Sequence, residues 1–497
     1  MNSRALKTAG IDKSTIDPEL GRIDRDSKTG EATGALRETA VGLVEKHVPP
    51  PTPEDMEAAL RYAQSHLHSL GVTSILDANV SPAMLEAYQR AQSSGILTLK
   101  VVAALATDPT KPMDQVDEMV RLRKQFSNGR VTVGTAKIFV DGVLEGKTAA
   151  LLEPYEGTDY KGFMNWNARQ LSDIVTRLDK QGFQVYMHAI GDAAVRAGLN
   201  AIEAARVANG PSDNRHQITH VEMVSPSDLP RFAKLDVIAN FQPFWWSFTK
   251  GKDDHRVSLV GIQRAEQFYP VRKILSHGAR IVEGSDWPIT EANPFHGIEA
   301  ALVYPANRAP STDDTGASLD LETLLAAYTI DGAFASHREK EIGSISMGKA
   351  ADFIVIDRDL FAATPAEVGE TIVLSTFVDG KPVFEKGKAR ATDEPLIPVA
   401  LNNLLSRIHA GMTIHEVETV LSTAYPGVKG QMGEWSGQTG YIDYKLTERY
   451  TLSVSSITRK GEAVVHDEIL FYLYDWPLKH RFDLKVYEWE KQAKEKP

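Results

Sequence analysis

Cysteine is absent from the 497-residue sequence. The chain can therefore form no disulfide, has no thiolate nucleophile and offers no cysteine ligand for a zinc site. Any metal ion would have to be bound by His, Asp, Glu or a chemically modified side chain.

Long apolar runs and excess positive charge are absent as well. No apolar run approaches the ~20 residues of a membrane-spanning helix, and Met1 to Asp12 contain no apolar core of a signal peptide. Lys and Arg total 55 against 66 Asp and Glu, a net charge of −11, which disfavours a broad nucleic-acid or anionic-membrane surface. We therefore expect a cytoplasmic protein without nucleic-acid or membrane partners, and a homo-oligomer is compatible with the sequence.

From about residue 52 onward, short β-branched runs alternate with amphipathic helical segments. Repeated β-α units predict either an open doubly wound sheet or a (β/α)8 barrel. No G-x-G-x-x-G follows the first run, which weakens the dinucleotide-binding form of the open sheet. Most of the seven predicted strands are apolar on both faces, as in a covered parallel sheet: Val72–Asp77, Leu97–Leu105, Thr135–Val140, Gln184–His188, Gln217–Val221, Val237–Gln242 and Arg280–Glu283.

The segments on either side of this α/β region have a different character. The N-terminal segment is polar and contains no strand-like run, and Asp393-Glu394-Pro395 marks a boundary near the other end. Beyond it, one helix from Thr413 to Leu421 and a series of strand-like runs predict a separate α+β domain. We therefore divide the chain into four parts: an N-terminal insert (1–51), the barrel (52–338), a small β-module (339–392) and the α+β domain (393–497).

Four polar residues stand at the C-terminal ends of predicted strands, where barrel enzymes keep their active sites. They are Lys137, His188, His220 and Asp286. Each has an ordinary explanation by itself: a hydrogen-bonded core histidine, a lysine paired with a carboxylate, or a Gly-Ser-Asp turn. The order Lys, His, His, Asp on four separate strand ends favours one shared site.

The motifs that contain these residues resemble the amidohydrolase superfamily, in particular its metal-dependent amidohydrolase 3 (YtcJ-like) type. The resemblance extends over about residues 2–390. A motif near residue 350 resembles the returning part of the family's β-sandwich. The motifs are Lys137-Ile138-Phe139-Val140-Asp141-Gly142, His188-Ala189-Ile190-Gly191-Asp192, Gln242-Pro243, Gly284-Ser285-Asp286-Trp287-Pro288 and Gly348-Lys349-Ala350-Ala351-Asp352-Phe353.

The resemblance implies a TIM-like barrel that hydrolyses non-peptide C–N bonds in small amide-like substrates. Lys137 would carry a carbamate that bridges two divalent ions, zinc by preference. A lysine can form a carbamate when its pKa is lowered, and the pKa of lysine changes readily on burial. His188 and His220 would bind the second ion through neutral imidazoles. Asp286 would contact the metal and carry a proton from the attacking water to the leaving amine.

One family feature has no counterpart here. The family's first barrel strand ends in His-x-His and lies before the segment that matches Asn2-Ser3. The sequence therefore predicts a barrel without its first strand, fewer than two bound metals and impaired hydrolysis. His66-Leu67-His68 is no replacement, because positions i and i+2 of a helix point in nearly opposite directions.

Three explanations for the missing strand remain: an incomplete gene product, which we favour, a chain completed by a partner, or a degenerate enzyme. An incomplete N-terminus would also remove any export signal.

Other residues and functions remain as alternatives. Phe244 and Trp245 follow a predicted strand and either line a substrate pocket or pack against the barrel rim. Asp141 and Asp192 each follow a candidate ligand by four residues, but turn chemistry accounts for both. Adenosine-deaminase-type chemistry has no need of Lys137. A non-catalytic scaffold or binding module, with the C-terminal domain as its active part, is the alternative outside enzymes.

Overall fold

A computed structural model describes most of the chain. The described residues are 1–248, 255–265, 267–303, 319–388, 412–422, 429–436, 439–445, 450–459, 462–465, 470–475 and 480–485. The chain divides into two compact units, one formed by Met1–His47 and Ala63–Lys388 and the other by Val48–Tyr62 and Ala389–Pro497. The boundary predicted at Asp393-Glu394-Pro395 lies outside the described residues.

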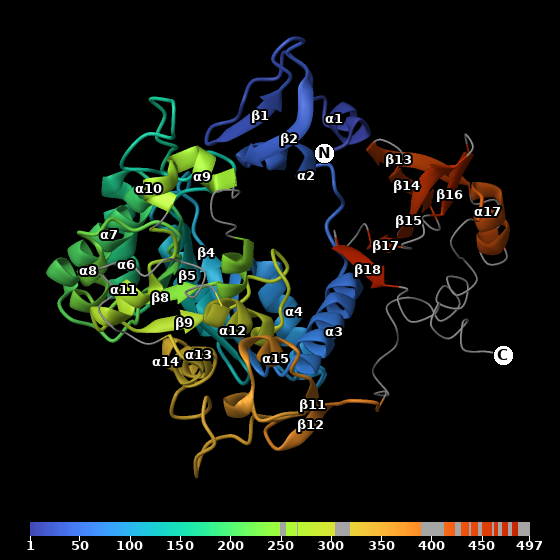
Figure 1. Cartoon of the computed structure of the whole chain (residues 1–497). Helices are drawn as coiled ribbons and strands as arrows, with labels where there is room; N and C mark the ends of the chain where they lie inside the picture. Colours follow the sequence, from blue (N-terminus) through green and yellow to red (C-terminus); the bar gives the residue numbers. More distant parts are fainter. Residues whose placement is uncertain are drawn as a thin grey trace. The chain divides into compact units, whose positions relative to one another are not determined.

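The first unit is built around a curled parallel sheet (Figure 1). Within the described residues this sheet has seven strands, which lie side by side in chain order. The seven predicted strand positions are confirmed to within a few residues, and so is the α/β class. The strands are β3 (Ser74–Val80), β4 (Lys100–Ala106), β5 (Val131–Phe139), β6 (Gln184–Ala189), β7 (Gln217–His220), β8 (Ile238–Phe241) and β9 (Ile281–Glu283).

Amphipathic helices connect these strands and cover the sheet. Helix α6 is typical: Asn167 and Gln170 form a capping box at its start, and Leu171, Ile174 and Leu178 form a buried stripe at helical spacing. The helices of this region are α4 (Pro82–Ser93), α5 (Gln115–Phe126), α6 (Ala168–Lys180), α7 (Asp192–Asn209), α8 (Leu229–Lys234), α9 (His255–Val260), α10 (Ile262–Ala265), α11 (Val271–Ser276), α12 (Pro294–Val303), α13 (Leu321–Tyr328) and α14 (Ile330–Ala335).

The N-terminal segment forms an antiparallel hairpin of β1 (Gly21–Arg25) and β2 (Ala32–Glu38), flanked by α1 (Ser3–Thr8) and α2 (Gly42–Glu45). The expectation of no strand in this segment was wrong. Ile23 is the single fully buried residue of β1, and charged residues flank it. An apolar run is therefore missing, and an ion pair between Arg37 and Asp24 joins the strands instead.

The histidines of His66-Leu67-His68 lie on helix α3 (Pro53–Ser69), as predicted. His68 is fully buried. Its Nδ1 lies 2.9 Å from the carbonyl oxygen of Val72, and its Nε2 lies 2.8 Å from Oγ1 of Thr98. Both ring nitrogens therefore have structural partners.

A three-stranded antiparallel sheet of β10 (Phe353–Ile356), β11 (Val373–Val378) and β12 (Lys381–Glu385) follows the parallel sheet in the chain. It is attached at the start of β4, where the buried ammonium of Lys100 pairs with Asp352 and, at 2.8 Å, with Asp379. This ion cluster lies at the amino end of the parallel sheet, away from the carboxyl ends of its strands.

The second unit contains helix α17 (Ile414–Ser422), which Thr413 and Glu416 cap as the sequence predicts. An antiparallel sheet follows, coloured red in Figure 1. Its strands are β13 (Gly430–Ser436), β14 (Thr439–Lys445), β15 (Tyr450–Arg459), β16 (Glu462–Val465), β17 (Leu470–Asp475) and β18 (His480–Lys485). Across the described residues of both units, no helix is long and apolar enough to cross a membrane.

Candidate functional site

The four predicted site residues lie at the carboxyl edge of the parallel sheet. Lys137 is two residues from the end of β5, His188 one residue from the end of β6, and His220 ends β7. Asp286 follows β9 by three residues. His220 and Asp286 have φ angles of +75° and +55°, a left-handed conformation that is uncommon outside glycine and concentrates at functional sites.

His188 and His220 form a buried pair of imidazoles whose ring centroids are 4.6 Å apart. Nε2 of His188 lies 3.0 Å from the carbonyl oxygen of Gly142. Because a carbonyl oxygen only accepts, Nε2 carries the proton and Nδ1 keeps a free lone pair. Nδ1 of His220 lies 2.7 Å from Oε1 of Gln242 and donates to it, which leaves Nε2 of His220 free.

Both imidazoles are neutral. Burial, with the nearby charge of Lys137, lowers the pKa of His188 to about 3. Burial, with His188 and Lys137 beside it, also lowers the pKa of His220 well below its usual value. Neutral imidazoles with one bonded and one free nitrogen have the chemistry of metal ligands.

Lys137 and Asp286 form the charged part of the site. The Lys137 side chain is 4% exposed, and its Nζ lies 4.6 Å and 4.8 Å from the ring centroids of Phe139 and Tyr186. Burial lowers the pKa of Lys137 to about 8, although the Asp286 carboxylate opposes the shift. Burial also raises the pKa of Asp286, and here Lys137 opposes it. A lysine amine that deprotonates this easily can react as a nucleophile.

Asp141 has a larger role than the turn chemistry the sequence favours. Its carboxylate is 1% exposed and accepts the backbone N–H groups of Ala150 (2.9 Å), Ile190 (3.1 Å) and Gly191 (2.9 Å). One of its oxygens lies 3.8 Å from Nε2 of His188. Burial raises the pKa of Asp141 to about 7, while the three amide donors lower it. Its partners lie 9 to 50 residues away, so no local pattern could have revealed them.

Trp245 and Phe244 lie on the short helix η2 (Pro243–Phe248). The Trp245 ring stacks on the ring of His220, with centroids 4.9 Å apart and an interplanar angle of 6°. Its Nε1 is buried and has no hydrogen-bond partner among the residues that the structure describes. The half-buried Phe244 instead faces His296 of α12, with ring centroids 6.4 Å apart. The structure therefore brings Trp245 to the histidine pair and Phe244 toward a neighbouring helix.

The side chains available as ligands decide how a metal ion could be bound. Among the described residues, no three His, Asp or Glu side chains lie close enough together to bind one ion. The histidine pair supplies two free nitrogens, so further ligands would have to come from Asp286 and from oxygen atoms added to Lys137. The residue types therefore suit a metal ion, but the described side chains do not by themselves form a complete ligand set.

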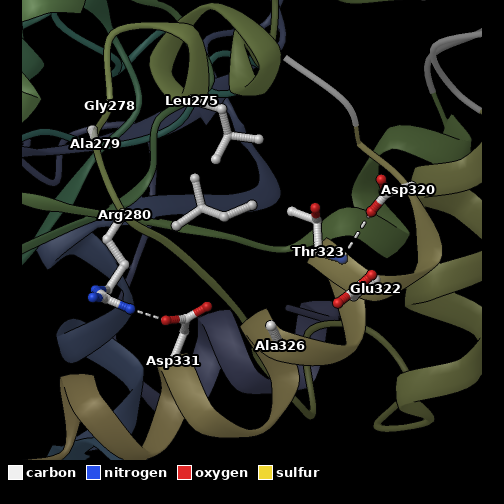
Figure 2. A pocket seen from close by; sticks show the side chains of 10 residues that line it. Leu275, Gly278, Ala279, Arg280, Asp320, Glu322, Thr323, Ala326 and Asp331 are labelled. Atoms are coloured by element: carbon white, nitrogen blue, oxygen red, sulfur yellow. Dashed lines mark hydrogen bonds and ion pairs between the residues drawn. The ribbon is translucent and has the colours of Figure 1, made fainter.

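A cavity of about 450 Å³ lies elsewhere, between β9, α11 and α13 (Figure 2). Three of its charged residues have structural partners: Arg280 pairs with Asp331, and Asp320 caps α13 through the backbone N–H of Thr323. None of the four predicted site residues lines it, and we assign it no binding function.

The curled parallel sheet is consistent with a TIM-like α/β fold, with the four candidate residues at its carboxyl edge. The model of the amidohydrolase family (Amidohydro_3) matches residues 1–384. The chain therefore belongs to the amidohydrolase family, a class of hydrolases, and the resemblance drawn from its motifs is confirmed.

Relatives and a solved structure agree with this assignment. The chain is 29% identical to the putative amidohydrolase YtcJ of Bacillus subtilis over 78% of this chain and 72% of that protein. It is 28% identical to the N-substituted formamide deformylase of Arthrobacter pascens, over 78% and 71%. The crystal structure of an uncharacterized metal-dependent hydrolase from Pyrococcus furiosus matches at 28% identity and a TM-score of 0.56, covering 72% of this chain and 70% of that one.

Proposed function

We propose that this chain is a metal-dependent hydrolase of non-peptide C–N bonds in small amide-like molecules. The observation that carries the proposal is the buried pair His188 and His220, each with one free ring nitrogen, together with the nearby Lys137, whose pKa is lowered. The similarity to a formamide deformylase and to a metal-dependent hydrolase supports the bond type and the metal dependence.

A divalent ion, zinc by preference, would be held by His188, His220, Asp286 and a carbamate on Lys137, and it would supply an acidified water and polarise the substrate carbonyl. The carbamate forms when the neutral Lys137 amine attacks carbon dioxide and releases one proton. Asp286 suits the task of accepting the proton of the attacking water and passing it to the leaving amine, because burial raises its pKa.

Trp245 is proposed to bind the substrate. Its unpartnered Nε1 is a buried donor next to His220, and a substrate carbonyl or amide oxygen is the complementary acceptor. Phe244, whose ring faces His296 of α12, is proposed to contact an apolar part of the substrate. Nucleic acid and membranes are not proposed as partners.

We further propose that the 497-residue chain binds fewer than two metal ions and turns over slowly, because the described residues supply only part of a metal site. Two imidazoles account for half of the four histidines that the family resemblance implies. The ligand positions that are present support an amidohydrolase whose metal site is incomplete.

The test measures metal content and the lysine modification together. The 497-residue chain is purified with zinc and bicarbonate, zinc per chain is measured by mass spectrometry, and the carbamate is observed by ¹³C NMR after equilibration with ¹³CO₂. We expect fewer than two zinc ions and a carbamate signal that Lys137→Ala removes. The matched control Lys111→Ala changes an exposed lysine, with 65% of its side chain accessible, and should keep both.

Each result has a defined meaning. Two tightly bound ions with rapid turnover of amides would refute the incomplete site. No bound metal and no carbamate in the unmodified chain would refute the hydrolase proposal and leave the scaffold alternative.

A further inference from the structure

A continuous series of amide side chains, three of them buried and one half-buried, runs through the parallel sheet toward His220. It begins at Gln184, the first residue of β6, whose Nε2 lies 2.7 Å from two backbone carbonyl oxygens, those of Arg215 and Ala335. Because carbonyl oxygens only accept hydrogen bonds, the NH₂ group of Gln184 must face them. The orientation of this amide is therefore fixed by the backbone.

Each amide fixes the orientation of the next one, because an amide oxygen only accepts and an amide NH₂ group only donates hydrogen bonds. Oε1 of Gln184 accepts from Nε2 of Gln217 (3.1 Å) and from the hydroxyl of Thr135 (3.1 Å). Oε1 of Gln217 accepts from Nδ2 of Asn240 (3.0 Å), and Oδ1 of Asn240 accepts from Nε2 of Gln242 (2.9 Å). Turning any one of these amides over would set like groups face to face at its contacts. We call Gln184, Gln217, Asn240 and Gln242 the amide ladder.

The ladder ends on a site residue. With its NH₂ group committed to Asn240, Gln242 presents Oε1 to Nδ1 of His220 at 2.7 Å. Oε1 of a glutamine has no proton to give, so Nδ1 must be the donor. The ladder side chains of Gln184, Gln217 and Gln242 belong to residues that are at most 3% exposed, so bulk water is a poor substitute for these partners.

We infer that Gln242 is a positioning residue for His220, and that the amide ladder sets the tautomer of that imidazole from the backbone at the far end of the sheet. The ladder holds the proton on Nδ1 and directs the lone pair of Nε2 into the site. The use of that lone pair as a metal ligand rests on the proposed function, whereas the tautomer does not.

The decisive measurement is the tautomer itself. In the metal-free chain labelled with ¹⁵N-histidine, long-range ¹H–¹⁵N NMR distinguishes a protonated Nδ1 from a protonated Nε2, and the His220 signals are assigned by their loss in His220→Gln. We expect His220 to carry its proton on Nδ1. Gln242→Leu should shift the population toward the Nε2 tautomer and weaken Co²⁺ binding by about 10- to 100-fold, the usual cost of losing a partner of a ligating histidine.

Two more variants test the ladder and the acceptor separately. Asn240→Leu does not remove the contact with His220, but it frees Gln242 to turn over, so it should also populate the Nε2 tautomer. Gln242→Glu keeps an acceptor at Nδ1 and should restore the original tautomer. The matched control is Gln64→Leu, since Gln64 is another buried glutamine, bonded to Ile96 and Thr98 outside the ladder, and it should leave His220 unchanged.

The outcomes separate this inference from the proposed function. A proton on Nε2 of His220 in the unmodified chain, or an unchanged tautomer in Gln242→Leu, would overturn the role of Gln242. An unchanged tautomer in Asn240→Leu would overturn the ladder. If Gln242→Leu does not fold, the tautomer of the unmodified chain still tests the role of Gln242, and Asn240→Leu tests the ladder. Failure of every variant and the unmodified chain to bind Co²⁺ would instead count against the metal-dependent function.

Discussion

The Asp141 carboxylate is predicted to hold two loops in place around His188, the β5–α6 and β6–α7 connections, and replacing it tests that role directly. Asp141→Ala removes the acceptor of three backbone N–H groups, those of Ala150, Ile190 and Gly191. A buried donor left without a partner costs about 1–3 kcal/mol. Three such donors, offset by relief of the buried carboxylate, give an expected loss of about 3–5 kcal/mol in local stability.

Asp141→Asn should lower local stability less than Asp141→Ala does, because asparagine can keep some of the three hydrogen bonds. One carboxylate oxygen accepts from Ala150 and Gly191, and the other accepts from Ile190. Asparagine has one acceptor oxygen, so it keeps at most two of the three bonds and turns its NH₂ group toward the third donor. We expect a loss of about 1–3 kcal/mol.

Hydrogen exchange of the three amides is the assay, because it reports the free energy of opening at those sites. The unmodified chain should protect them strongly, Asp141→Asn less and Asp141→Ala least. Asp173→Ala, on the surface of α6 with 59% of its side chain accessible, should stay within about 0.5 kcal/mol of the original. Unchanged protection of all three amides in Asp141→Ala would refute the reasoning.

The same carboxylate has a predicted pH signature. Its pKa is raised to about 7 in the folded chain, above the unfolded value of about 3.9. The folded state therefore binds this proton more tightly, and the resulting stability is present below about pH 4 and is lost as the pH rises through about 7. The stability lost in Asp141→Ala, relative to the unmodified chain, should accordingly be smaller at pH 8 than at pH 5. A loss that grows over this range would contradict the predicted direction of the pKa shift.

Three further variants give predictions elsewhere in the first unit. Burial alone would raise the pKa of Asp179, but hydrogen bonds from His216 and three other side chains hold that pKa below its usual value. Asp179→Asn should therefore lower the free energy of unfolding in urea most above about pH 4, and this loss should fade as the pH falls toward 3. Lys100→Met removes the cationic partner of the buried Asp352 carboxylate and should lower the free energy of unfolding by about 3–5 kcal/mol, measured by heat or urea. A change below about 1 kcal/mol would show that the ion cluster does not stabilise the fold. Trp245→Phe keeps a ring on His220 but removes the N–H donor; with a panel of formamides, KM should rise about tenfold, and an unchanged KM would remove the indole from substrate binding.

Much of the parallel sheet could be read from the sequence because its strands are apolar on both faces and separated by helical periodicity. The same pattern placed Lys137, His188 and His220 at strand ends, where their backbone positions follow from the strand alone. The hairpin β1–β2 was not predicted, because the one buried residue of β1, Ile23, does not form an apolar run.

The contacts that orient the site residues were harder to foresee. Asp141 contacts Gly191, 50 residues away, and Gln242 contacts His220, 22 residues away, and only the fold brings these residues together. A signal for the ladder was nevertheless present: Gln217 with Thr219, and Asn240 with Gln242, place polar residues two apart in otherwise apolar strands. Polar residues at strand period share a face, so they predict an internal hydrogen-bonded column.

The stacking of Trp245 on His220 also has an optical consequence. An indole 4.9 Å from the imidazole ring lies within the range at which a bound Co²⁺ or Cu²⁺ quenches tryptophan emission. The chain contains seven tryptophans, so the difference in fluorescence between the unmodified chain and Trp245→Phe isolates this one. The fold thereby provides its own reporter, through which occupancy of the histidine pair can be followed in real time without labelling.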